Sequence, residues 1–253
     1  MKIINAEWEK RNIGVSTAEI SIEEEDTFAD LQAIQRELDK SYEYICLKCK
    51  TNAPDFLFGL NKLGYTFIET QIALEFKSKK YQVPDELTHL INQYKGRISF
   101  IKVEDEIRLE SVLGKIRDQE MFLTDRIYLD PVFSSDKSGK RYYCWCKDAY
   151  QNGGMIYEII VDDVPVGMNA LNKPSGTAYS GIVGGVYPDH NDYAFLTPII
   201  GHLFFQYLIA QGMRSLKSAV SSNNKSMLKL NLSSGYQVAD VYHVYVKHQK
   251  GKE

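Results

Sequence analysis

The stretch that decides the fold reads Thr177-Ala178-Tyr179-Ser180-Gly181-Ile182-Val183-Gly184-Gly185-Val186-Tyr187. Its small and β-branched residues predict a strand, but glycines inside a strand weaken it and are typical of a bulge or a close backbone approach. The alternative is that these glycines only relieve crowding between packed layers. A polar turn (188–192) and an apolar helix (198–211) follow. We therefore predict a strand leading into a helix N-terminus, where free N–H groups and the helix dipole favour a phosphate-bearing ligand.

The residues on either side of this stretch read as alternating strands and helices. Downstream come a strand (214–220), a helix entered through Asn224, and a last strand opened by Gly235 and Tyr236. Upstream, hydrophobic periodicity predicts strands at 14–22, 42–49, 65–76, 97–103, 155–161 and 165–171, and helices at 28–40, 52–63, 85–94, 104–116 and 141–151. The irregular stretch between them (122–139) is long enough to predict a binding loop.

These elements divide the chain into two unequal parts. We expect a smaller βαβαβ domain at 1–82, a linker with a short helix at 83–96, and a larger domain with a mixed α/β sheet at 97–253.

Composition narrows the function classes. The 253 residues carry a net charge of −3, so nothing indicates the basic surface of a nucleic-acid-binding protein. The start of the chain lacks the pattern of a signal peptide, and the apolar run 194–210 reads as a buried helix too short to span a membrane. The four cysteines do not have metal-knuckle spacing, and we predict buried thiols, no metal site and a cytoplasmic location.

The element order from residue 97 onward resembles the GNAT (N-acetyltransferase) superfamily, whose mixed sheet parts between its fourth and fifth strands to admit acyl-CoA. Those strands would be 177–187 and 214–220. The family pattern Asn-x-x-Ala-x-x-Leu-Tyr-x-x-x-Gly-Phe reads here Asn224-Lys225-Ser226-Met227-Leu228-Lys229-Leu230-Asn231-Leu232-Ser233-Ser234-Gly235-Tyr236. The resemblance implies a GNAT fold preceded by a smaller, partial-GNAT-like βαβαβ domain, with acetyl-CoA as co-substrate.

The resemblance also implies cofactor-binding residues. The backbone of Gly184, Gly185 and Val186 would pair with the pantetheine arm and polarise the thioester carbonyl. The turn before the helix would hold the pyrophosphate through four residues: Asn191, Ala194, Leu196 and Thr197. This turn departs from the basic, glycine-rich family loop, because Asp189 and Asp192 repel phosphate and Pro198 lacks an N–H. The Asn224 amide would donate to the cofactor, although a helix N-cap role explains it equally well.

The catalytic acid departs from the family as well. Asn231 stands where a tyrosine usually protonates the departing thiolate, and an amide can donate a hydrogen bond but cannot supply a proton. Tyr242, His190 or a water remains as the proton source, so Asn231 and Tyr242 are the candidate catalytic residues. No general base stands out in the sequence.

Within the superfamily, the chain resembles the TDP-fucosamine acetyltransferases of bacterial surface-polysaccharide synthesis. The matching segments are Trp8 to Val15, Leu60 to Tyr65, Arg126 to Pro131 and Tyr142 to Trp145. The resemblance implies transfer of an acetyl group to a primary amine, on an amino sugar carried by a nucleotide. Arg126 would bind a phosphate or carboxylate and Tyr128 a ring, although a solvated surface role explains Arg126 nearly as well.

Two alternatives remain at this point. The chain could be a non-catalytic GNAT-fold binding protein that has lost CoA, or an acyltransferase that uses a carrier-protein thioester. In every case we expect a small-molecule amine or nucleotide-sugar partner rather than nucleic acid, and a homodimer stays open.

Overall fold

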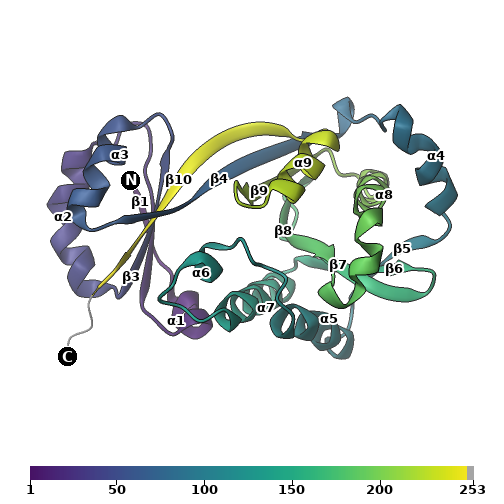
Figure 1. Ribbon diagram of the computed structural model, residues 1–253, viewed down its shortest axis with the longest axis horizontal. Coiled ribbons are helices and arrows are strands. Elements are labelled where there is room, and N and C mark those ends of the chain that lie inside the picture. The colour runs from purple at the N-terminus through teal and green to yellow at the C-terminus, as the bar shows by residue number, and fades with distance from the viewer. Residues whose placement is uncertain (250–253) are drawn as a thin grey trace.

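The computed structural model describes residues 1–249 and contains one mixed sheet of ten strands, in the order β1-β2-β3-β10-β4-β9-β8-β7-β6-β5 (Figure 1). The strands are β1 (Lys2–Asn5), β2 (Thr17–Ser21), β3 (Tyr44–Lys50), β4 (Thr66–Lys77), β5 (Ile98–Lys102), β6 (Met155–Val161), β7 (Val164–Leu171), β8 (Ala178–Val186), β9 (Ser215–Ser221) and β10 (Gln237–His248). The predicted mixed α/β class is confirmed.

Helices connect these strands. The α-helices are α1 (Glu7–Ile13), α2 (Phe28–Ser41), α3 (Pro54–Gly59), α4 (Asp85–Tyr94), α5 (Glu106–Asp118), α6 (Arg126–Leu129), α7 (Asp136–Gln151), α8 (Thr197–Ala210) and α9 (Lys225–Ser233). Three 3₁₀ helices complete the set: η1 (Leu60–Leu63), η2 (Ser78–Lys80) and η3 (Pro188–Leu196).

Two elements were missed and two segments were predicted wrongly. The sequence pattern missed β1 and α1, so the strand predicted at 14–22 is β2, the second strand. The stretch 122–139 is not irregular throughout, because Asp125 accepts from the Ile127 N–H and starts α6, and α7 already begins at Asp136. The polar turn after β8 is the 3₁₀ helix η3, which runs to Leu196.

Helices cover the sheet on both faces. Alternate residues of β6 point to opposite sides, so that Ile156 packs against α5 and α7 while Ile159 packs against α8. At the other end of the sheet, α2 and α3 cover β2 and β3 through a core that includes Leu31, Leu47 and Phe56. Figure 1 shows these two packed regions at opposite ends of an elongated molecule.

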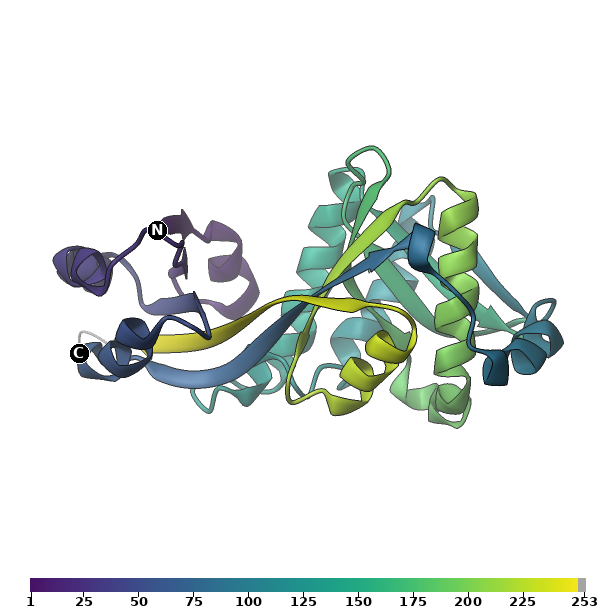
Figure 2. The same cartoon turned by 90° about the horizontal axis from the view of Figure 1, so that it is seen from above.

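The two long strands β4 and β10 join these regions. Strand β10 pairs with β4 along most of its length, from Gln237↔Glu75 to Val246↔Thr66, and its residues from Tyr242 to His248 also pair with β3 on the opposite edge. On its other edge, β4 pairs with β9 from Gln71 to Lys77. Figure 2 shows both strands running from one region to the other. The expected division at 1–82 and 97–253 stays a prediction, and the C-terminal strand extends across it.

Three further features concern a membrane span, the cysteines and a metal site. By length and composition alone, the helical stretch Pro188–Ala210 is apolar enough to cross a membrane, but 44% of its most apolar window is buried inside the protein, and core helices of soluble proteins share this property. Cys46, Cys49 and Cys146 are buried, Cys144 is half-buried, and all four are free thiols. Within residues 1–249, no group of three His, Cys, Asp or Glu side chains is arranged to hold a metal ion.

Candidate functional site

The strands β8 and β9 part soon after they begin. They pair in parallel only through Ala178↔Ser215, Tyr179↔Leu216 and Ser180↔Lys217. Beyond these pairs a cavity of about 1460 Å³ is lined by residues of both strands, and residues of β4, α6 and α7 also line it. The predicted separation of these two strands is therefore confirmed.

The cavity edge of β8 has free backbone groups. From Gly181 to Val186 the strand pairs with β7 on one side, and a register shift places Ile182 in a bulge. A Cβ at Gly184 would lie 1.9 Å from Asn169 Oδ1 and 3.3 Å from the Met168 carbonyl oxygen, so the Asn169 side chain would have to move to admit a larger residue. At Gly181 and Gly185 the nearest atoms would be 3.7 and 4.0 Å away, which leaves room at the cavity wall. An extended, amide-bearing chain could hydrogen-bond along this edge.

Comparison with solved structures agrees with this geometry. A GCN5-related N-acetyltransferase from Sphaerobacter thermophilus matches with a TM-score of 0.63 and 10% identity, covering 99% of this chain and 76% of that one. One from Kribbella flavida matches with a TM-score of 0.56 and 14% identity, over 93% and 82% of the two chains. The chain has the GNAT fold. A tandem GNAT protein from the clavulanic acid biosynthesis pathway also matches, with a TM-score of 0.54 and 11% identity over 94% and 76% of the chains.

Sequence comparison adds no closer relative. No protein-family model matches the chain, and no curated protein matches it either. At these identities the solved structures establish the GNAT fold alone.

The residues of the helix tip beside β8 that line the cavity are uncharged. Asn191, Ala194 and Thr197 line the cavity, as does Pro198. The Thr197 N–H and hydroxyl both donate to the Ala194 carbonyl, the hydroxyl at 2.6 Å, so the 3₁₀ turn satisfies these donors itself. Within the described chain, no Lys or Arg from β8, η3, α8, β9 or α9 lines the cavity. This half of the cavity fits the uncharged pantetheine arm of CoA and offers no cationic side chain to a diphosphate.

Leu196, the remaining residue predicted for the pyrophosphate loop, has a different position. Its side chain is 1% exposed and packs with Ile199 and Ile200 in the core under α8. Leu196 belongs to the hydrophobic core because the η3 turn points it inward.

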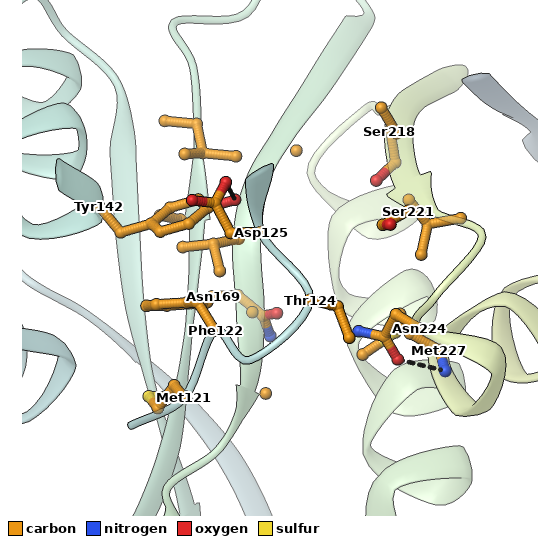
Figure 3. Close-up of a pocket in the computed structure, with 18 of the residues that line it drawn as sticks. Met121, Phe122, Thr124, Asp125, Tyr142, Asn169, Ser218, Ser221, Asn224 and Met227 are labelled. Atoms are coloured by element: carbon orange, nitrogen blue, oxygen red, sulfur yellow. Dashed lines mark hydrogen bonds between the residues drawn. The ribbon is translucent and has the colours of Figure 1, made fainter. Parts of the chain in front are cut away.

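Helix α9 brings two predicted residues to the cavity. The Asn224 side-chain oxygen accepts from the Met227 N–H at 3.1 Å and caps the helix. Figure 3 shows the amide nitrogen of Asn224 on the other side, facing Thr124 across the cavity. Both roles considered for Asn224 are thus compatible with its geometry. Asn231 also lines the cavity, one turn beyond Met227.

Besides Leu196, two predicted residues do not line the cavity. Tyr242 lies in β10 between Lys50 and Gln71 of the neighbouring strands, and its hydroxyl donates to Asp240 at 3.2 Å. It is held there because this half of β10 is inserted between β3 and β4. Tyr128 lies in α6, outside the lining residues.

The second half of the cavity, which we call the acceptor compartment, is lined by charged and aromatic residues of β2, β3, β4, α1, α6 and α7: Trp8, Glu9, Glu19, Lys48, Glu69, Asp125, Arg126, Arg141, Tyr142 and Trp145. Figure 3 shows Tyr142 and Asp125 across the cavity from Ser218 and Ser221 of β9. The compartment therefore faces the strand that forms the second wall of the parted sheet.

Buried ion pairs hold this compartment together. Arg126 Nη2 donates to Glu9 at 3.2 Å and to Glu19 at 2.8 Å, and Arg141 Nε donates to Glu9 at 2.6 Å. The Asp125 carboxylate lies 3.5 Å from Arg141 Nη1. Arg126 was predicted to bind an anion, but two carboxylates already share its charge. Opposing the effect of burial, Arg126 and Arg141 lower the pKa of Glu19.

Glu69 is one of several cavity residues that sequence reasoning missed. It lies in β4, two residues before Gln71, where the pairing of β4 with β9 begins, and it is 6% exposed. Burial raises the pKa of its carboxyl, and the nearby Asp125 acts in the same direction against Ser221, Arg126 and Lys48. In the sequence, Glu69 is only a carboxylate inside a strand pattern. The pairing of β4 with β9 is what places it at the cavity.

Proposed function

We propose that the protein is an acyl-CoA-dependent N-acetyltransferase that acts on a primary amine. The observation that carries the proposal is the cavity between β8 and β9, which joins a free strand edge to a compartment containing a buried carboxylate. An acyl donor and an amine could enter it from its two halves and meet where the strands part. The GNAT fold supports the same reaction class.

Acetyl-CoA would supply an acetyl group activated as a thioester. The free backbone edge of β8 between Gly184 and Val186 would position the donor and donate hydrogen bonds to the carbonyl oxygen. Asn231 would donate a hydrogen bond to the departing sulfur, and water would supply the proton, because an amide has none to give.

The proposal includes an acceptor class and a cellular location. The resemblance to TDP-fucosamine acetyltransferases predicts an amino sugar on a nucleotide, and we keep the amino sugar as the acceptor class. A cytoplasmic location and a small-molecule partner accompany this assignment. The competing function is a binding protein with no turnover, and the uncharged helix tip together with Asn231 favours it.

Calorimetric titration with acetyl-CoA tests the proposal, together with a substitution that fills the gap between the strands. Ser218 lies at the cavity wall in β9, with its hydroxyl 3.7 Å from where a Gly181 Cβ would be. We expect Ser218→Phe to abolish acetyl-CoA binding, and Ser218→Ala, the matched control, to retain it. Equal binding by both variants would place the donor elsewhere and refute the proposal.

A transfer assay separates the two functions. Release of free CoA thiol with glucosamine as acceptor is expected of the enzyme. Binding of acetyl-CoA without thiol release from any amine would favour the binding protein. If acetyl-CoA does not bind, a carrier-protein thioester becomes the donor to test.

A further inference from the structure

The protein has two tryptophans, and both line the acceptor compartment. Trp8 lies in α1 and is 41% exposed, and Trp145 lies in α7 and is 38% exposed. Tryptophan is highly buried in most proteins, so two accessible indoles at one cavity wall indicate a ligand that covers them. An indole offers a broad apolar face, and it therefore favours a ligand that has an apolar face of its own.

The neighbours of Trp145 hold its ring in place. It stacks on Tyr142, with the ring centroids 5.8 Å apart and the ring planes inclined by 23°. The Tyr142 centroid is in turn 4.0 Å from that of Phe122, and the guanidinium carbon of Arg141 lies 5.6 Å from the Trp145 centroid. Because these contacts fix the indole before a ligand binds, a ligand that stacks on it orders few further side chains.

Trp8 belongs to the same compartment because α1 packs against α7 (Figure 1). Arg11 donates two hydrogen bonds to the Asp148 carboxylate, at 3.0 and 2.5 Å, and joins the two helices. Trp8 shares a helix face with Arg11, and Trp145 shares one with Asp148, since residues three apart are neighbours on a helix surface. The N-terminal part of the chain thus supplies one of the two indoles.

Accessible polar side chains line the compartment together with the indoles. Asp148 follows Trp145 by one helical turn, and its side chain is 37% exposed although it pairs with Arg11. Glu19 also lines the cavity, with a side chain that is 28% exposed. A wall that combines ring faces with carboxylate oxygens is complementary to a ring that is apolar on its face and hydroxylated at its edge.

We propose that the acceptor compartment holds the ring of a hydroxylated, sugar-like amine by stacking it on Trp145, with Trp8 of α1 as a second contact. This inference rests on the proposed function and deepens it, because it assigns the residues that select the acceptor. A pyranose has an apolar C–H face, which would cover the indole, and hydroxyls at its edge, which would donate to the carboxylates. A planar aromatic amine would cover the indole as well but would leave the carboxylates without hydroxyl donors.

Tryptophan fluorescence reports on this contact directly, because both tryptophans line the compartment. Three amines separate the ring from the hydroxyls. Glucosamine has both, benzylamine has a ring without hydroxyls, and 2-amino-1,3-propanediol has hydroxyls without a ring. We expect glucosamine to change the fluorescence and to bind roughly tenfold more tightly than either of the other two. No change with glucosamine, or equal affinity for either of the other amines, would overturn the inference.

Trp145→Leu is the decisive variant, and Phe58→Leu is its matched control, because Phe58 is an aromatic side chain of α3 that is 78% exposed and lies outside the cavity lining. We expect Trp145→Leu to lower the calorimetric affinity for glucosamine roughly tenfold and Phe58→Leu to leave it unchanged. In transfer, Trp145→Leu should raise KM by a similar factor with kcat nearly unchanged, because stacking stabilises the ground state and the transition state alike. Wild-type affinity in Trp145→Leu would overturn the inference.

Trp145→Phe tests the same contact with less change to the packing. It keeps an aromatic ring and should retain most of the glucosamine affinity. Its fluorescence comes from Trp8 alone, so a response at saturating glucosamine is expected from the contact with α1. A Trp8 signal that does not change would overturn the part assigned to α1.

Failure of this inference and failure of the proposed function give different results. Transfer to all three amines at similar rates, unchanged in Trp145→Leu, would retain the acetyltransferase and refute the stacking site. Binding of glucosamine that depends on Trp145, without release of CoA thiol, would retain the stacking site and refute the acetyltransferase.

Discussion

Replacing Glu9 by Gln tests whether the buried ion pairs hold α1 of the N-terminal part against α6 and α7. Glu9 is 0% exposed and compensates Arg126 and Arg141, whose side chains are 7% and 8% exposed. Removing one partner of a buried pair typically costs 3–5 kcal/mol. Because Glu19 and Asp125 remain nearby, we expect the lower end, about 3 kcal/mol of unfolding free energy.

Thermal unfolding followed by circular dichroism measures this loss. For a chain of this size, about 3 kcal/mol lowers Tm by roughly 6 to 12 °C. The control is Glu37→Gln, which breaks the surface pair with Lys40, where the side chains are 74% and 70% exposed. It should change stability by less than about 0.5 kcal/mol. A Glu9→Gln variant as stable as this control would show that the arginines do not depend on Glu9, which refutes the reasoning.

Three further predictions concern single residues of the cavity. Asn224→Ser should keep the helix cap, and Tm within a degree or two, but weaken acetyl-CoA binding in calorimetry, because serine lacks the amide donor; unchanged affinity would leave Asn224 a cap only. Gly184→Ala should cost about 1–3 kcal/mol in urea unfolding, and adding Asn169→Ala should recover most of it if the 1.9 Å contact is the cause. Glu69→Gln should raise Tm at neutral pH. The pKa of Glu69 in the folded protein lies above its ordinary value of 4.5, so the folded protein loses stability as the pH rises from 4.5 through the folded-state pKa, and glutamine removes this loss. This gain in Tm should vanish below pH 4.5. Asp125 raises the Glu69 pKa while Arg126 and Lys48 lower it, and the net shift is upward, so these residues should not reverse the effect. A gain in Tm independent of pH would contradict this explanation.

Much of the donor half could be predicted from local sequence. Glycines inside a strand and an Asn at a helix start are local signals, and β8, α9 and the parting beside them lie where those signals place them. Leu196 was predicted to bind the cofactor because a loop was expected there, whereas a 3₁₀ turn directs its side chain into the core.

The acceptor half could not be predicted in the same way. Glu9, Glu69 and Arg141 are separated by 60 to 132 positions in the chain, and the packing of α1 against α7 and of β4 against α6 brings them to one cavity. Tyr242 was expected in the site because β10 was treated as a strand of the C-terminal part. Tyr242 instead lies between Lys50 of β3 and Gln71 of β4, and its hydroxyl donates to Asp240, so it does not line the cavity.

Hydrogen–deuterium exchange with and without acetyl-CoA tests the central claim most directly, because it locates the donor on the backbone. The account predicts that acetyl-CoA slows exchange in peptides covering Gly181 to Val186 and the start of α9, while the paired strands β6 and β7 change little. Unchanged exchange from Gly181 to Val186, with protection elsewhere or nowhere, would contradict it.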